Sequence, residues 1–120
     1  MNPIQCVLLS CRKSAVLAMG TAAIICSSTV MATEAEYALS IQEHRFQPAE
    51  LVVTSGKKIK LTVENRDSTP EEFESHDLNR EKVIAGKSSA TIFVGPLAPG
   101  RYRFYGEFNE KTAQGVIVAQ

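Results

Sequence analysis

Apolar and polar residues alternate with a period of two along much of the chain between residues 37 and 118. The alternation is clearest at residues 58–64, where Ile59, Leu61 and Val63 each follow a polar residue. This period is that of a β-strand with one buried face. Comparable short apolar stretches predict further strands at residues 37–41, 51–53, 83–84, 89–94, 101–105 and 116–118.

Turn-forming residues separate the predicted strands at intervals of about ten residues. Pro48 predicts a bend at residues 46–48, because proline fixes the backbone and removes a hydrogen-bond donor. Residues 71–78 alternate less regularly, and residues 79–82 form a polar link. No window has a helical period. The pattern predicts one all-β domain, an antiparallel Greek-key β-sandwich of seven or eight strands.

The first 32 residues follow a different pattern. Arg12 and Lys13 precede an uncharged apolar run at residues 14–26, and Val30-Met31-Ala32 fits a cleavage site. This order is that of a secretory signal peptide. The run is shorter than the roughly 20 apolar residues of a membrane span, although an uncleaved N-terminal anchor is the alternative. We therefore expect a signal peptide at residues 1–32, and an exported, periplasmic domain at residues 33–120 that does not itself bind the membrane.

Cleavage after Ala32 would remove every sulfur atom from the protein. All cysteines and methionines lie in the first segment: Cys6, Cys11, Cys26, Met1, Met19 and Met31. The remaining domain would have no disulfide and no soft sulfur ligand for a metal. It would keep eleven Lys and Arg residues against thirteen Asp and Glu residues, without a basic stripe. Nucleic acid is therefore not an expected partner.

Two parts of the predicted domain resemble the cupredoxin family. The chain resembles the front half of a small cupredoxin at Phe46-x-Pro48, Val53-x-x-Gly56 and Leu61-x-Val63-x-Asn65. It resembles the strand before the cupredoxin ligand loop at Pro99-Gly100-Arg101-Tyr102-Arg103-Phe104. It resembles the closing strand at Gly115-Val116-Ile117-Val118. The resemblance covers most of residues 33–120. It implies a cupredoxin-like sandwich in which the loop at residues 106–114 occupies the place of a metal-ligand loop.

A type 1 blue-copper site needs two histidines, one cysteine thiolate and usually a weak axial methionine. The resemblance places these four ligand positions at Glu71, Gly106, Asn109 and Thr112. None of the four residues is the expected ligand, and residues 33–120 contain no cysteine at all. We therefore expect no type 1 blue-copper centre in this protein.

Four shorter phrases resemble a subgroup of small periplasmic cupredoxin-like proteins associated with bacterial high-affinity iron uptake. They are Glu72-Phe73-Glu74-Ser75, Leu78-Asn79-Arg80-Glu81-Lys82, Gly106-Glu107-Phe108 and Thr112-Ala113-Gln114-Gly115. The subgroup commonly carries a histidine where this chain has Asn109. The resemblance implies an accessory protein that handles copper or iron. Its implied partner is a membrane iron permease or another periplasmic iron-uptake component.

The candidate metal ligands are carboxylates, and they fall into two groups that the resemblance places at one pole of the sandwich. Carboxylate oxygens with one imidazole suit iron, Mn(II) or Cu(II) better than Cu(I). The alternative is that these acids are solvated and paired with nearby basic residues. The candidates are Glu72, Glu74, His76, Glu107 and Glu110, followed by Glu71 and Asn109.

Three further features have simpler interpretations. His44 follows the first predicted strand, and we favour an exposed loop histidine over a ligand. Ser75-His76-Asp77 is not a catalytic triad, because consecutive strand residues point to opposite faces. Phe108 would be a docking anchor for a partner if exposed and a cap over the site if buried. Phe73 and Phe104 are expected in the core.

The sequence supports two main hypotheses. The first is an exported cupredoxin-like domain that binds a copper or iron ion through carboxylates, and in part through His76, as an accessory of periplasmic iron uptake. The second is a metal-free module that docks a permease or oxidase through the same acidic pole. An enzyme that oxidises ferrous iron by itself is less favoured, because no residue set supplies an electron acceptor.

Overall fold

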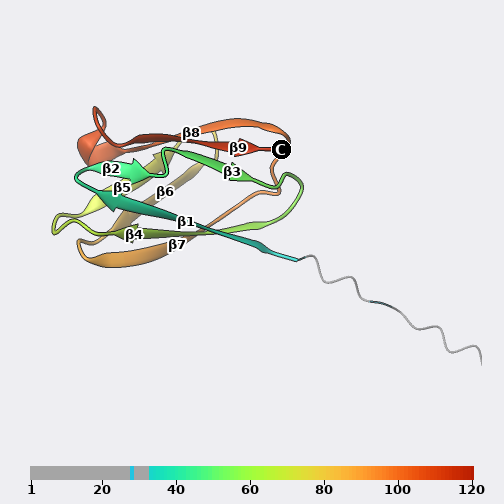
Figure 1. Cartoon of the computed structure of the whole chain (residues 1–120), viewed down its shortest axis with the longest axis horizontal. Coiled ribbons are helices and arrows are strands. Elements are labelled where there is room, and N and C mark those ends of the chain that lie inside the picture. The colour runs from blue at the N-terminus through green and yellow to red at the C-terminus, as the bar shows by residue number, and fades with distance from the viewer. Residues whose placement is uncertain (1–27, 29–32) are drawn as a thin grey trace, which may run out of the picture.

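The protein is described here from a computed structural model, which covers Ser28 and residues 33–120. The predicted signal peptide therefore lies, apart from Ser28, outside the described residues. The described chain forms a sandwich of two β-sheets with a single short 3-10 turn (Figure 1). Within residues 33–120, no helix has the length and apolar character needed to cross a membrane.

One sheet has four strands in the order β2-β1-β4-β7. Its strands are β1 (Ala35–Gln42), β2 (Arg45–Gln47), β4 (Ile59–Asn65) and β7 (Ser88–Val94). The other sheet has five strands in the order β3-β9-β8-β5-β6. Its strands are β3 (Glu50–Val53), β5 (Glu71–Ser75), β6 (Arg80–Ile84), β8 (Gly100–Gly106) and β9 (Gln114–Ala119), with the 3-10 turn η1 (Glu107–Asn109) between the last two.

The all-β sandwich is confirmed, but it has nine strands within residues 33–120 instead of seven or eight, and three further details of the prediction were wrong. Two strand pairs, β1 with β4 and β3 with β9, are parallel. The bend at residues 46–48 contains a short strand, because Glu43 and His44 adopt positive φ and let β2 fold back on β1. The polar link at residues 79–82 belongs largely to β6. This edge strand exposes most of its side chains, so no apolar alternation marks it.

The core lies between the sheets and is centred on three phenylalanines. The Phe73 and Phe104 rings stack with centroids 5.1 Å apart, and the edge of Phe46 meets Phe104 at 4.9 Å. Phe73 and Phe104 are almost completely buried, as expected. Such aromatic pairs contribute about 0.5–1.5 kcal/mol beyond the area they bury. Phe73 and Phe104 lie on β5 and β8, so their packing holds together the two strands that carry the site.

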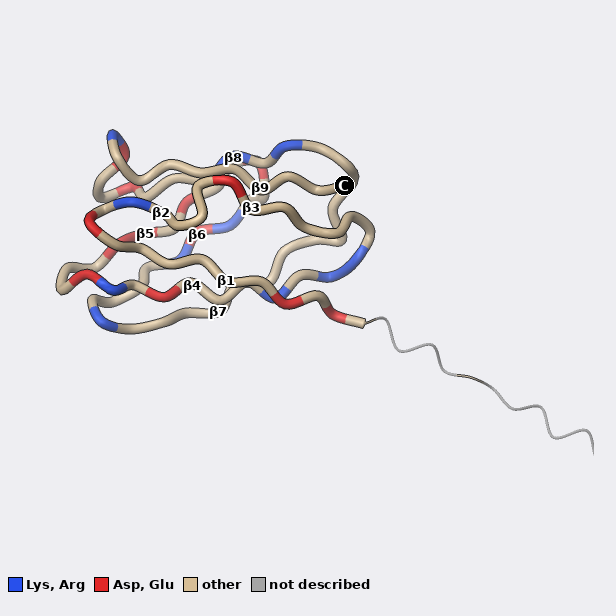
Figure 2. Tube along the Cα trace, viewed as in Figure 1, with Lys and Arg blue, Asp and Glu red and all other residues tan. Residues whose placement is uncertain are grey.

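Charged residues are interspersed along the sandwich (Figure 2). Figure 2 shows Lys and Arg mixed with Asp and Glu along most of the tube, and the charged residues of β8 are the two arginines Arg101 and Arg103. This distribution gives no electrostatic footprint for a nucleic-acid backbone.

Candidate metal centre

The segment between β8 and β9 folds back onto the beginning of β5. The Gly106 N–H donates to the Ala113 carbonyl at 2.8 Å, and the Ala113 N–H donates to the Asn109 carbonyl at 2.8 Å. Within this closed segment, η1 packs against β5. The two groups of candidate carboxylates, one on β5 and one on the segment, therefore lie at the same end of the sandwich.

The positions that correspond to copper ligands meet inside this end of the domain. Asn109 Nδ2 donates to Glu71 Oε2 at 2.7 Å, although the two residues are far apart in sequence. Gly106 lies beside them. A Cβ atom added at Gly106 would come within 2.6 Å of Glu71 Cδ and 2.7 Å of Ala113 Cβ. The Glu71 carboxyl group thus fills the space next to the position where a cupredoxin carries its cysteine.

The Glu71 carboxylate is buried and fully engaged in hydrogen bonds. Its side chain is among the most buried in the described chain, with the residue 1% exposed. Oε1 accepts from the backbone N–H groups of Phe108 and Glu72, each at 3.0 Å. No Lys, Arg or His of residues 33–120 forms an ion pair with it. The negative charge is stabilised by hydrogen-bond donors, as for a carboxylate at a helix N-terminus.

A type 1 copper ion does not fit these residues. The thiolate is replaced by Gly106, and the adjoining space is taken by the Glu71 carboxyl group. Asn109 presents a donor N–H to Glu71, so its nitrogen has no lone pair to offer a metal. Thr112 Oγ1 is directed to the Asn109 carbonyl at 3.3 Å. The interior of this pole is closed by Glu71 and Asn109, two of the secondary candidates of the sequence.

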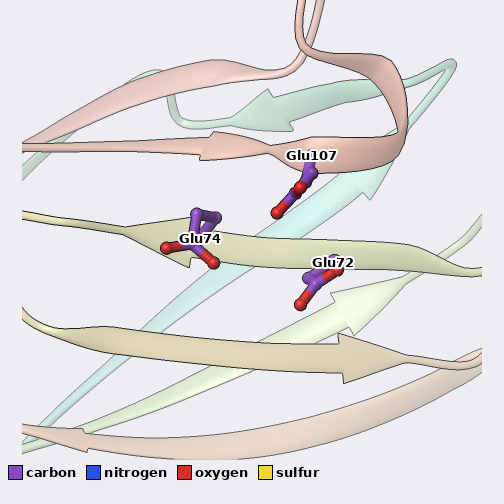
Figure 3. Close-up of side chains that lie close together, drawn as sticks. All are labelled: Glu72, Glu74 and Glu107. Atoms are coloured by element: carbon purple, nitrogen blue, oxygen red, sulfur yellow. The ribbon is translucent and has the colours of Figure 1, made fainter.

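A second group of carboxylates lies outside the sandwich (Figure 3). Glu72 and Glu74 alternate with the buried Phe73 on β5 and face outward, and Glu107 begins η1. One carboxylate oxygen from each of the three residues lies within 4.8 Å of the other two. Glu74 is buried, Glu72 half-buried and Glu107 exposed. These three residues are called the outer carboxylate group below.

Like charges accumulate around the outer carboxylate group. Partial burial raises the pKa of Glu72 above its usual value, and the charges of Glu107, Glu81 and Glu74 raise it further. Glu81 on β6 lies directly opposite Glu74. Burial and then the charge of Glu74 also raise the pKa of Tyr105, the residue opposite Glu74 on β8. A bound cation would offset this repulsion.

His76 and Glu110 lie beside the outer carboxylate group rather than in it. His76 Nδ1 is 3.6 Å from Glu74 Oε1, on the side that the sequence predicted. Its Nε2 is 3.0 Å from the Tyr105 hydroxyl, and its side chain is 81% exposed. Glu110 lines a groove together with His76 and Tyr105. Both residues could reach a bound ion only by changing their side-chain conformation.

The remaining candidates are His44 and Phe108, and both are exposed. His44 lies in the turn after β1, where its N–H donates to Asp67 Oδ2 at 2.9 Å and its Nδ1 is 3.7 Å from the same oxygen. The histidine is exposed and tied to a neighbouring loop. Phe108 is 50% exposed, which matches the docking interpretation rather than a cap over the site.

Ser75 and Asp77 extend the pairing of β5 with β8 by means of their side chains. Ser75 Oγ donates to the Arg103 carbonyl at 2.6 Å, and Asp77 Oδ2 accepts the Arg103 N–H at 2.7 Å. The two side chains thus satisfy the backbone of β8 beyond the last strand pair. The contacts of Ser75 and Asp77 with Arg103 and the contact of Tyr105 with His76 were not predicted from the sequence. Tyr105 could have been found from its outward position in the alternation of β8.

Comparisons with known proteins agree with this fold. The profile of the family described as "Cupredoxin-like domain" matches residues 15–119, so the chain belongs to the cupredoxin-like family. The chain is 45% identical over 83 residues to "Uncharacterized protein RP394" of Rickettsia prowazekii, an alignment that covers 69% of this chain and 66% of that protein. The chain therefore spans just under two thirds of the length of this relative.

Among solved structures, the fold is similar to auracyanin A, a "blue" copper protein from Chloroflexus aurantiacus, with a TM-score of 0.63 and 12% identity. That match covers 73% of this chain and 100% of auracyanin A. A chain of a heme-copper terminal oxidase dimer matches with a TM-score of 0.61 and 14% identity, over 72% of this chain and 65% of that one. At such identities the likeness concerns the fold alone.

Proposed function

We propose that this protein is an exported cupredoxin-like accessory protein that binds a copper or iron ion through the outer carboxylate group. The observation that carries the proposal is the proximity of Glu72, Glu74 and Glu107, whose ligand oxygens lie within 4.8 Å of one another. Separations of this size allow three oxygens to bind one ion after small rotations of the side chains. The inner pole is closed by Glu71 and Asn109, so any ion would bind outside it.

The donor set favours a hard cation. Three carboxylates supply only oxygen, which suits Fe(III), Fe(II), Mn(II) and Cu(II) rather than Cu(I). Their combined negative charge would be neutralised by a divalent or trivalent ion. His76 Nδ1 is 3.6 Å from Glu74 Oε1, so His76 could join the ion after a rotamer change. Because protons compete for Glu72, affinity for the cation should fall as the pH is lowered through the raised pKa of that residue.

We assign the protein a role in holding and delivering the ion in the periplasm during iron uptake. The assignment to iron uptake and to a membrane iron permease as partner comes from the resemblance to the iron-uptake subgroup at residues 72–75, 78–82 and 106–115. The outer carboxylate group is shallow and includes an exposed residue, so an ion bound there could be passed to a partner. The role is one of binding, and any oxidation of ferrous iron would belong to the system as a whole.

Calorimetric titration of metal ions tests the proposal. The protein produced from its full sequence, without a metal-binding tag, is titrated with Cu(II), Mn(II) and, under anaerobic conditions, Fe(II). We expect one ion per chain with a dissociation constant of about micromolar order for at least one of these ions. Glu74→Gln and Glu107→Gln should each weaken binding about tenfold or more, because each removes a charged ligand.

The control is Glu64→Gln, which changes an exposed carboxylate on β4 that pairs with Arg66. This variant should bind the ion as the wild type does. Binding no tighter than about millimolar for every ion tested would refute the proposal. An intense blue absorption with copper would contradict the expectation that no type 1 centre forms.

The exposed ring of Phe108 favours a second candidate function, a metal-free module that docks a protein partner. The ring is 50% exposed and lies between Glu107 and Asn109, next to the outer carboxylate group. An exposed aromatic residue beside a charged surface is typical of an interface anchor. Under this alternative, Phe108→Ala would weaken association with an iron permease measured by surface plasmon resonance, while metal titration of the wild type would give no binding.

A further inference from the structure

A shallow groove crosses the outer face of the five-stranded sheet, next to the outer carboxylate group. Its volume is about 800 Å³, which is within the range of small-molecule sites. Its lining residues lie on β8, on β9, in the turn after β5 and in the segments just before β3 and β9. Those with functional side chains are Arg101, Arg103, Tyr105, His76, Asp77, Glu110 and Gln114.

Two arginines of β8, Arg101 and Arg103, line the groove. Arg101 and Arg103 are exposed, and both face outward because they alternate with the inward-facing residues of β8. Residues two apart on a strand are separated by about 7 Å. Their side chains can therefore engage two carboxylates of one small molecule. Guanidinium groups bind carboxylates through paired N–H donors, which makes arginine suited to this ligand class.

Both guanidinium groups can accept a new partner. Arg101 pairs with Glu50 at 3.4 Å, but the two side chains are 62% and 56% exposed, and such a pair contributes little. The Arg103 guanidinium forms no ion pair among the residues that the structure describes. The nearby Asp77 carboxylate accepts the Arg103 backbone N–H, which satisfies one of its oxygens. A bound anion would thus displace only weak contacts.

The charge of the lining changes along the groove. Arg101 and Arg103 supply its positive charge along β8, whereas Asp77 in the turn after β5 and Glu110 near the segment that carries Glu107 supply negative charge. Tyr105 forms part of the boundary, because it lines the groove and also lies opposite Glu74 on β5. A molecule with carboxylate arms and a bound cation would match this order, with its arms on the arginines and the cation toward the acidic end.

We propose that the groove binds a small di- or tricarboxylate anion of the kind that chelates the cation. The use of this site to receive chelated metal rests on the proposed function, whereas the binding of the anion can be tested by itself. A chelator held on Arg101 and Arg103 would bring its metal ion to the side of Tyr105 that borders Glu74. Transfer would exchange oxygen ligands of the chelator for oxygen ligands of the outer carboxylate group, with no redox step.

The test uses metal-free citrate as the probe, with the full-length protein and buffers of constant ionic strength from which metal ions have been removed by a chelating resin. Binding is followed by NMR shifts of the backbone amides of Arg103, Tyr105 and Gln114 as citrate is added. We expect a dissociation constant of about millimolar order or tighter. Arg103→Gln should weaken citrate binding about tenfold, because it removes a charge-assisted pair of hydrogen bonds. The matched control Arg45→Gln, on an exposed position of β2, should leave it unchanged.

Three outcomes would overturn the inference. The first is the absence of citrate-induced shifts at about 20 mM. The second is an equal loss of citrate binding in Arg103→Gln and Arg45→Gln, which would indicate a general charge effect. The third is binding of inorganic phosphate as tight as that of citrate, which would refute the ligand class. None of these outcomes touches the outer carboxylate group, whose metal affinity is measured separately with Glu74→Gln.

Discussion

Replacing Glu71 with glutamine tests the view that the buried carboxylate stabilises the domain. Two opposing effects act on this side chain. Three donors, the N–H groups of Phe108 and Glu72 and the amide of Asn109, bind its oxygens at 2.7–3.0 Å. Against this, a charge buried without a cation carries a desolvation penalty of roughly several kcal/mol. Glu71→Gln keeps the shape of the side chain and removes the charge, so the sign of its effect shows which term is larger.

The three hydrogen bonds set the expected magnitude. A hydrogen bond to a charged group contributes about 1.5–3 kcal/mol net of desolvation, and a neutral one about 0.5–1.5 kcal/mol. Each bond should therefore lose about 1 kcal/mol when its acceptor becomes neutral. The glutamine oxygen can still accept the two backbone N–H groups, and Asn109 can turn its amide to accept the new NH2 group. We expect a net loss of about 3 kcal/mol in the free energy of unfolding.

Urea unfolding followed by circular dichroism measures this loss. With an m-value of about 1 kcal/mol/M, the midpoint should fall by about 3 M without a change of slope. Glu64→Gln is the control, because Glu64 is exposed and its pair with Arg66 contributes about 0.5 kcal/mol or less. A midpoint for Glu71→Gln equal to or above that of the wild type would refute the reasoning. It would mean that burial of the charge is unfavourable and that the carboxylate serves another purpose, such as binding a cation.

Three further variants test the same region and its surroundings. Gly106→Ala should lower the free energy of unfolding by about 1–3 kcal/mol, because its Cβ would lie 2.6 Å from Glu71 Cδ; an unchanged urea midpoint would contradict this. The His44 backbone N–H lowers the pKa of Asp67, so the stability that Asp67 contributes is present above the usual aspartate pKa and lost as the pH falls through the lowered value. Asp67→Asn should therefore unfold with a weaker acid dependence than the wild type, and equal acid slopes would refute this. Burial and neighbouring charges raise the pKa of Glu72, so the wild type loses stability as the pH rises through the raised value. In EDTA, Glu72→Gln should have a higher Tm than the wild type at pH 7 and a smaller advantage in acid, and an equal Tm at pH 7 would argue against repulsion in the outer carboxylate group.

The sequence predicted those strands that have one buried and one exposed face. β4 is the best example, because its buried residues Ile59, Leu61 and Val63 are separated by polar ones. β2 was missed because three residues are too few for a period to be seen. β6 was mostly missed because four of its five residues are exposed, so that pairing with β5 rather than burial defines it. The parallel pairs could not be predicted, since alternation does not identify the neighbouring strand.

The candidate site was predicted in its location but not in its division into two parts. The sequence brought carboxylates from two segments to one pole, and the structure places Glu72, Glu74 and Glu107 together there. It could not show that Glu71 points inward, because glutamate is almost never fully buried unless it has partners. Those partners are Asn109 and the backbone of Phe108, which come from a distant part of the chain.

The residues at the positions that the resemblance assigns to copper ligands depend on one another. Without the glycine at position 106, the carboxyl group of Glu71 would collide with a side chain. Without Asn109, its second oxygen would lose its donor. The bond from the Phe108 N–H to Glu71 fixes η1, and η1 begins with Glu107. The inner carboxylate therefore gives this segment the attachment that metal ligation gives a ligand loop, and it holds Glu107 where its oxygen faces those of Glu72 and Glu74. The closed interior and the outer carboxylate group are thus two consequences of one hydrogen-bonded arrangement. A variant that breaks the hydrogen bonds of Glu71 should therefore also move Glu107 away from Glu72 and Glu74.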